Sequence, residues 1–328
     1  MDLSRYSMRR AELDEDWDNF VEASPQGTIF SSTAFLSALP FRPAAWFCYK
    51  KNQRVGAAVL IETDDGEATR IAPHVIYGGF LLAPAPPEQQ RSQTYSEDFR
   101  ITSAMLRDLA AHYRSLNFNA SPALVDMRPF LWHNYGTPAP KIAINLRYTS
   151  YVTLAETAPG TSLDVNPIYL ACNKSRRQTI RYGLEEGVTV EETNDVDGFV
   201  SLYIQTFERQ GLAVDHDEIL LLSSVCKAMF EAGKLRMFAA RTSDGALGSV
   251  VVFGMDSKRV YYLYGANSPD LRSQHCGTLA LFEALTRLGR DGYSEADLEG
   301  INSPKRGYFK LSFGGDIRSY SQVSYPAP

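Results

Sequence analysis

The chain has 328 residues, of which 44% are hydrophobic and 22% are charged. This composition is typical of a folded protein, and the length favours two domains over one. The formal net charge of −5 excludes a uniformly basic nucleic-acid coat. We therefore expect no DNA partner, and any phosphate contact must come from a local basic patch.

The four cysteines lie far apart in the sequence and form no Cys-x-x-Cys pair. They predict free, buried thiols in a reduced compartment and no metal site. The charged N-terminus lacks the apolar segment of a signal peptide, and no apolar run approaches the ~20 residues that span a membrane. We therefore expect a cytoplasmic protein without a membrane span.

The first half predicts alternating strands and helices. A strand at 8–13 precedes a helix capped by Asp14, because Trp17, Phe20 and Val21 recur at helical spacing. The other expected elements are, in order, a helix after 31–33, a hairpin at 44–62, an apolar strand at 74–82, an exposed loop at 83–98, a helix at 99–116 and a buried strand at 123–127.

The second half predicts a similar order. The expected elements are a helix at 168–187, a strand at 188–192, helices at 197–211 and 218–233, a hairpin at 235–255, a strand at 259–267, a helix at 277–292 and a strand at 294–300. In both hairpins a polar turn is followed by a glycine, Gly56 or Gly248, near the start of the returning strand. We interpret this as an internal duplication with domains at 1–150 and 151–328, although two unrelated α/β halves can also match by chance.

The element order of the second half resembles the GNAT N-acyltransferase fold. In that fold, the loop before the long helix holds a pyrophosphate with backbone amides and reads Gln/Arg-x-x-Gly-x-Gly/Ala. Gln274 and Gly277 fit this pattern, but Leu279 stands where a small residue is expected. We expect the Leu279 side chain to crowd a diphosphate, which argues against coenzyme A.

The chain ends in a stretch, GYFKLSFGG, that carries a more specific signal. Phe309-Lys310 is followed by Phe313-Gly314, and this spacing resembles the ending of the Fem-type (FemABX) ligases. The similarity extends to WDNFVEASPQGTIFSSTAFL near the start, to KSRRQTIRYGLEEGVTV and to YYLYGAN, and so touches most of the chain.

The Fem-type resemblance implies two tandem GNAT-like α/β domains with mixed sheets flanked by helices. It also implies an enzyme that takes an amino acid from aminoacyl-tRNA and attaches it to an amine, with no cofactor beyond that co-substrate. The sequence has no heptad run that could form the coiled-coil arm of some cell-wall members. The acceptor can therefore be a soluble, amine-bearing small molecule as well as a cell-wall precursor.

The ending supplies the first candidate for catalysis. In the resemblance the Phe-Lys pair lies beside the acyl carrier, which implies that Phe309 and Gly314 bind the carrier. Lys310 would then stabilise the oxyanion of the tetrahedral intermediate or neutralise the terminal phosphate. The alternative is a lysine that only extends from a packed terminal segment to solvent.

Other candidates come from the residue pattern. Lys174, Arg177 and Arg181 share one helical face and predict phosphate binding, although a solvated face balanced by Glu185 and Glu186 fits the spacing equally well. Tyr262 and Tyr264 are expected to share one face of a strand. Asp297 and Glu299 lie at a strand end, where either could be the general base for the amine or merely cap a turn.

The sequence also suggests a metal site, which we reject, and two alternative functions. Asp215-His216-Asp217-Glu218 looks like a metal cluster, but consecutive residues cannot all face one ion, and acids are favoured at a helix start. An acyl-CoA-dependent N-acyltransferase of polysaccharide or metabolite synthesis is the alternative enzyme. A catalytically inactive protein that keeps the fold to bind RNA or a partner is the alternative outside enzymes.

Overall fold

The computed structural model describes residues 2–208 and 215–326. The chain divides into two compact units, 1–147 together with 319–328, and 148–318. We expected all of 151–328 in the second unit. The last ten residues belong to the first because the final strand, β13 (Asp316–Tyr325), pairs through residues 322–325 with β6 (Leu116–Asn119).

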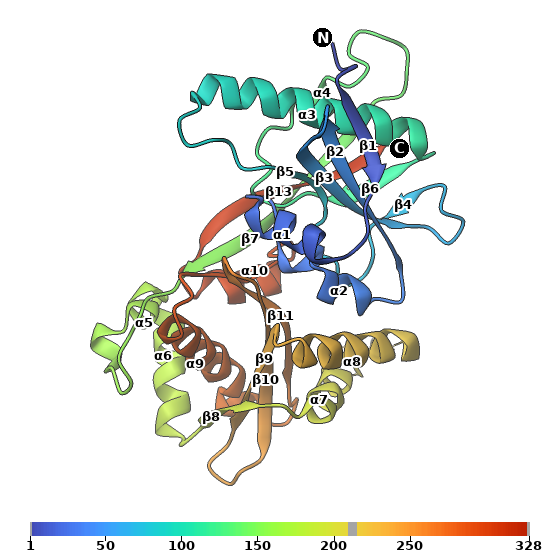
Figure 1. Ribbon diagram of the computed structural model, residues 1–328. Coiled ribbons are helices and arrows are strands. Elements are labelled where there is room, and N and C mark those ends of the chain that lie inside the picture. The colour runs from blue at the N-terminus through green and yellow to red at the C-terminus, as the bar shows by residue number, and fades with distance from the viewer. Residues whose placement is uncertain (1, 209–214, 327–328) are drawn as a thin grey trace. The chain divides into compact units, whose positions relative to one another are not determined.

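The first unit is built on a five-stranded sheet in which β1 (Tyr6–Arg10), β2 (Arg42–Lys50), β3 (Gln53–Glu62) and β4 (Thr69–Arg70) follow in order and β5 (Gly79–Leu82) also pairs with β3. The long helix α3 (Arg91–His112) lies along this sheet (Figure 1) and contributes Ile101, Met105 and Leu109 to the core. Shorter helices complete the unit: α1 (Glu15–Ala23), α2 (Thr33–Ser37) and α4 (Arg128–Leu131).

The second unit has the strand order β7-β12-β11-β10-β9-β8. Its strands are β7 (Ala143–Thr153), β8 (Thr189–Thr193), β9 (Leu235–Arg241), β10 (Leu247–Met255), β11 (Val260–Asn267) and β12 (Glu295–Asp297). Its helices are α5 (Pro167–Ala171), α6 (Lys174–Glu185), α7 (Val196–Glu208), α8 (His216–Glu231), α9 (Cys276–Arg290) and α10 (Pro304–Leu311).

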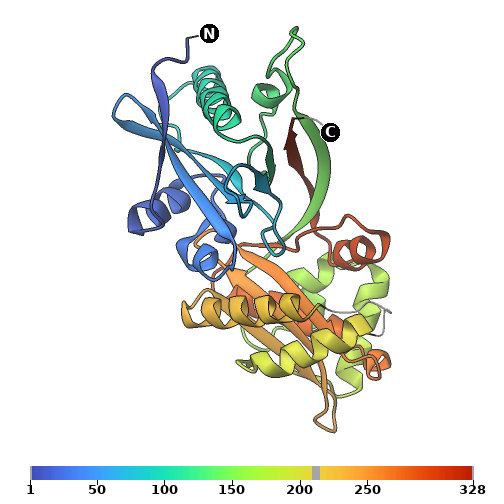
Figure 2. The same cartoon turned by 90° about the vertical axis from the view of Figure 1, so that its right-hand side faces the viewer.

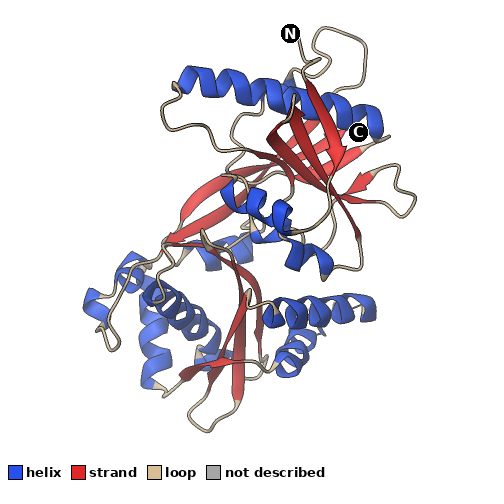
Figure 3. Ribbon diagram, viewed as in Figure 1, coloured by secondary structure: helices blue, strands red, loops and turns tan. Residues whose placement is uncertain are grey.

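Helices cover both faces of the second sheet (Figure 3). Helices α7 and α8 lie side by side on one face, as Figures 1 and 2 both show, while α6 and α9 pack together on the other. Helix α9 buries most of its residues in the core of this unit, which explains the apolar run that predicted it. In the described part of the chain, no helix is long and apolar enough to cross a membrane.

Three sequence predictions differ from the observed elements. The loop expected at 83–98 gives way at Arg91 to α3, and the strand expected at 123–127 lies instead at 116–119. Val125 is 84% exposed, so the apolar residues at 123–127 do not form a buried strand. The helix expected at 168–187 is broken because the Asn173 side chain accepts a hydrogen bond from the backbone of Arg176, as an N-cap does. The predicted end of the helix at 197–211 lies partly outside the described residues.

Candidate active site

The candidate site lies where two neighbouring strands of the second unit stop pairing. Strands β11 and β12 are parallel, and their register is limited to Val260 with Ala296 and Tyr261 with Asp297. Beyond these pairs β11 continues to Asn267, whereas β12 ends and the chain turns into the segment before α10. The residues that follow the carboxyl end of β12, Glu299 among them, are therefore not paired with β11.

Glu299 is the most unusual residue of this segment. It is 4% exposed, its φ of 58° lies in the left-handed region, and its Oε1 atom has no hydrogen-bond partner. Burial raises the pKa of Glu299 well above its ordinary value, opposed by Lys310 and reinforced by Asp297. Strained backbone and an unpaired buried carboxylate both cost stability, and such features concentrate at functional sites.

Lys310 stands in the last turn of α10, beside Glu299. Its Nζ atom donates a hydrogen bond to the Gly300 carbonyl at 3.4 Å and lies 5.3 Å from the centre of the Tyr262 ring. Burial lowers the pKa of Lys310, while the charges of Glu299 and Asp297 raise it. The aromatic neighbour that fixes the ammonium is therefore Tyr262, and not Phe309 of the sequence pair.

Asp297 has a different environment from Glu299. It is fully buried, and its Oδ1 atom accepts hydrogen bonds from the Thr149 hydroxyl and from the Glu299 backbone N–H, the latter at 2.7 Å. These two donors hold the turn in which Glu299 adopts its positive φ. The contacts favour a positioning role for Asp297 over that of the base itself.

The prediction that Tyr262 and Tyr264 share a face is wrong. The register with β10 pairs Phe253 with Tyr262 but Val252 with Tyr264, so the residue between the tyrosines is a β-bulge. The bulge reverses the alternation of the strand. Tyr262 consequently contacts Phe253 on the α9 side, at 5.5 Å between ring centres, while Tyr264 lies near Phe199 of α7.

Arg176, which was not among the predicted site residues, links three helices at this site. Arg176 donates to the Ser312 hydroxyl at 2.8 Å and to the Thr278 hydroxyl at the start of α9. Its guanidinium lies 4.6 Å from the Phe309 ring centre and 5.0 Å from that of Phe313. Burial lowers the pKa of Arg176. The only sequence signal for it was membership of the basic run, on a face other than the expected one.

The segment after α10 explains two residues of the GYFKLSFGG ending. Phe313 is fully buried in the core of the unit and packs edge-on against Phe309 at 5.4 Å. Gly314 has a φ of 82°, and a Cβ atom there would collide with the carbonyl oxygen of Ala171. Both residues therefore have structural reasons for their identity, and contact of Gly314 with an acyl carrier stays a prediction.

Replacing Phe313 with Ala should lower the free energy of unfolding by roughly 3–5 kcal/mol, because it leaves a cavity in a closely packed core. Chemical denaturation measures this change. Tyr308→Ala, in the helix α10 that precedes Phe313, is the control, since Tyr308 is 67% exposed; it should change stability by no more than about 0.5 kcal/mol. Equal losses in the two variants would contradict this assignment of Phe313 to the core.

The basic face of α6 lacks internal charge partners. Lys174, Arg177 and Arg181 form no ion pair with any described residue, and Arg181 donates instead to the Tyr169 hydroxyl at 2.8 Å. Lys174 and Arg177 occupy the first turn of the helix, where cations oppose the helix dipole. The balance by Glu185 and Glu186 that the sequence allowed does not occur, so these cations are available to an anion.

The prediction that Leu279 crowds the start of α9 is wrong. Its side chain is 1% exposed and faces Gly183 of α6, where a Cβ atom would lie 3.6 Å from that of Leu279. At Gly277, by contrast, a Cβ atom would collide with the Asn267 side chain at the end of β11. The sequence argument against a diphosphate at this helix therefore fails.

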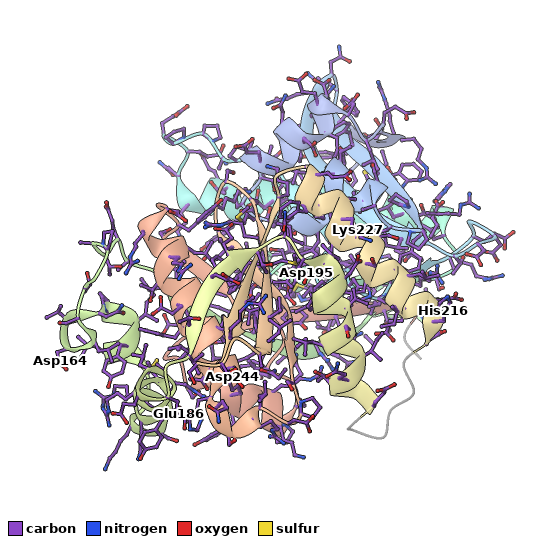
Figure 4. The ribbon with its side chains drawn as sticks, turned by 90° about the horizontal axis from the view of Figure 1, so that it is seen from below. Asp164, Glu186, Asp195, His216, Lys227 and Asp244 are labelled. Atoms are coloured by element: carbon purple, nitrogen blue, oxygen red, sulfur yellow. The ribbon has the colours of Figure 1, made fainter. Side chains whose placement is uncertain are left out.

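The acidic stretch before α8 is a helix start. Asp215 accepts a hydrogen bond from the backbone of Asp217 at 3.2 Å as the N-cap, and His216 lies at the outward end of α8 (Figure 4). Among the described residues, no group of three or more His, Cys, Asp or Glu side chains is arranged to hold a metal ion.

Comparison with known proteins finds a family model that matches most of the second unit. Residues 172–310 match a family model described as "Acetyltransferase (GNAT) domain". This segment is therefore similar to GNAT acyltransferase domains. It contains β11, β12, α9 and α10, and so includes Glu299 and Lys310. No curated protein sequence matches the chain.

Solved structures extend the similarity to both units. The chain is similar to FemX with a TM-score of 0.64 and 13% identity, over 95% of this chain and 96% of that one. It is also similar to a tandem GNAT protein from the clavulanic acid biosynthesis pathway (TM-score 0.52, 11% identity, 98% and 99% covered). A third similar structure is L-PGS from Bacillus licheniformis, with a TM-score of 0.52 and 11% identity, over 96% of this chain and 92% of that one. The expected fold, two tandem GNAT-like units, is confirmed.

Proposed function

We propose that the protein is an aminoacyl-tRNA-dependent N-acyltransferase that forms an amide bond between an amino acid and an amine-bearing small molecule or cell-wall precursor. One observation carries the proposal: the Oε1 atom of Glu299, just after β12, is buried without a hydrogen-bond partner, and the charge of Lys310 in α10 acts on this carboxyl group. A general base and a cation are two groups that accelerate acyl transfer to an amine. A binding protein without catalysis would have no use for a strained, unpaired buried carboxylate.

The reaction follows from the chemistry of the two groups. The amine nitrogen attacks the carbonyl carbon of the aminoacyl ester, and Glu299 takes a proton from that nitrogen. The C–N bond forms, the ester C–O bond breaks, and the ribose oxygen leaves with the proton that Glu299 returns. Lys310 stabilises the negative oxygen of the tetrahedral intermediate. The raised pKa of Glu299 makes it a stronger base than an exposed glutamate once it is ionised.

The α6 basic face favours tRNA as the acyl carrier. Lys174, Arg177 and Arg181 lack ion-pair partners in the described chain, and phosphate groups satisfy such side chains. The Fem-type resemblance of the GYFKLSFGG ending, now located in α10 and the turn after it, points to the same donor.

An acyl-CoA donor is the second candidate, and one observation favours it. Because Leu279 is buried against α6, the first turn of α9 is not obstructed by its side chain. The N-terminus of a helix of this length can bind a diphosphate through its free N–H groups and its dipole.

Label transfer distinguishes the two donors. Purified protein is incubated with the small-molecule fraction of a bacterial extract and either total tRNA charged with labelled amino acids or labelled acetyl-CoA. We expect a base-stable, low-mass labelled product from charged tRNA and none from acetyl-CoA. Product from acetyl-CoA alone would replace the proposed donor with the second candidate.

The arginines of α6 give a test that is independent of the acceptor. Replacing both Arg177 and Arg181 with Ala should weaken binding of charged tRNA and make log Kd less dependent on log salt, because fewer counterions are released. Fluorescence anisotropy at several salt concentrations measures both quantities. The control is a double variant in which two exposed arginines of the first unit, Arg107 and Arg114, are replaced with Ala. An unchanged salt slope in the α6 variant would return this face to a solvated surface.

A further inference from the structure

The first unit contains a cavity of about 880 Å³ that no residue of the proposed acyl-transfer site lines. Its walls come from β1, the end of β2, the N-terminal half of α3, and α4. An adjoining cavity of about 610 Å³ shares Lys50, Glu97 and Arg100 with it. Cavities of this size accommodate small-molecule ligands.

One wall of the larger cavity is aromatic and open to solvent. Phe99 and Trp132 lie 5.3 Å apart between ring centres, and Trp132 is 53% exposed. Tyr95, 46% exposed, belongs to the same wall. The Arg128 guanidinium lies 5.4 Å from the Phe99 ring and 5.7 Å from that of Trp132. Large rings left in water are stabilised by a flat π system that stacks on them.

The other wall carries an excess of positive charge. Glu97 accepts from the Tyr6 hydroxyl at 2.8 Å and from Lys50 at 2.6 Å, and Arg100 approaches the same carboxylate at 3.5 Å. One carboxylate thus serves two cations. The charged residues that line the cavity are four cations and two acids: Arg5, Lys50, Arg100, Arg128, Asp2 and Glu97. Arg128 is also paired with Asp126 at 2.6 Å, which leaves an excess of one positive charge. The local excess contrasts with the net charge of −5 for the whole chain.

From this combination we infer that the cavity binds a nucleotide, with the base stacked on Trp132 and Phe99 and the phosphate held by Arg100 and Lys50. Stacking on aromatic side chains and phosphate contacts to Arg and Lys are two common means by which proteins hold nucleotides. A purely apolar ligand would leave the excess positive charge without a partner, and inorganic phosphate would leave the rings uncovered. The inference goes beyond the proposed function, because it concerns a ligand of the first unit alone.

Tryptophan fluorescence tests this site directly. The protein has three tryptophans, and Trp17 and Trp46 are buried at 0% and 8% exposure, so a stacked ligand should quench Trp132 selectively. The probes are ADP, UDP, inorganic pyrophosphate and a single-stranded eight-nucleotide RNA, each also titrated by calorimetry. We expect quenching by the nucleotides and none by pyrophosphate. Quenching by RNA only would assign the same nucleotide chemistry to a strand, whereas quenching by free ADP or UDP assigns it to a small molecule.

Variants decide whether the binding occurs in this cavity. Trp132→Ala and Arg100→Gln should each raise Kd by about tenfold or more, while Trp132→Phe, which keeps a ring, should retain most of the affinity. The controls are Tyr135→Ala, which removes a 79% exposed ring, and Arg114→Gln; neither residue lines the cavity. Absence of binding by every nucleotide probe, or equal affinity in Trp132→Ala and the wild type, would overturn the inference. Because no acyl donor is present, its failure would leave the proposed acyl transfer untouched.

Discussion

Glu299→Gln should slow acyl transfer by roughly 10²–10⁴-fold, because the amide cannot take the proton from the attacking amine. The substitution keeps the shape of the side chain and removes an ionisable group from a buried position. Single-turnover rates measured with excess enzyme report the chemical step. Asp297→Asn is the matched comparison: its amide oxygen can still accept from Thr149 and from the Glu299 N–H, so we expect a smaller loss.

Glu299→Gln should also change how the free energy of unfolding depends on pH. A purely structural role for Glu299 would not produce this change together with the loss of rate. The pKa of Glu299 is raised in the folded state, so the protein is most stable while Glu299 is neutral. That contribution is present below the unfolded pKa of about 4.3 and is lost as pH rises through the folded pKa. The free energy of unfolding of Glu299→Gln should therefore exceed that of the wild type by an amount that grows with pH. A constant difference from pH 4 to pH 9 would contradict the raised pKa.

Lys310→Met should reduce the transfer rate by roughly 10²–10³-fold, the effect of removing one charge-stabilising donor from an oxyanion site. The free energy of unfolding should change by less than about 1 kcal/mol, because the methionine chain keeps the apolar contact with Tyr262. Lys305→Met, at an exposed position of the same helix, is the control and should retain the wild-type rate. Full activity in Lys310→Met would mean that the lysine only packs at the end of α10.

The general plan of the second unit could be predicted from sequence because it depends on local patterns. The apolar spacing of α9, the polar turn between β9 and β10, and the Phe309-Lys310 pair all mark positions that tertiary structure preserves. Lys310 and Glu299, eleven residues apart in the sequence, were both selected as candidates. The turn after β12 brings them close together. A carboxylate at the predicted end of a strand does not reveal the shape of that turn.

The errors arose where pairing between distant segments decides the local geometry. The bulge that turns Tyr264 away from Tyr262 depends on the register with β10, and alternation within one strand cannot reveal it. Leu279 faces α6 because Gly183 leaves space there, which the loop motif does not encode. The return of β13 to β6 in the first unit likewise depends on two segments about 200 residues apart.

The measurement that tests the central claim most directly is label transfer from charged tRNA by three proteins at equal concentration: wild type, Glu299→Gln and Lys310→Met. The account predicts a base-stable product with the wild type and at least about a hundredfold slower formation with each variant, at unchanged tRNA affinity. Equal rates in all three proteins would contradict it, since the acyl transfer would then depend neither on Glu299 after β12 nor on Lys310 in α10.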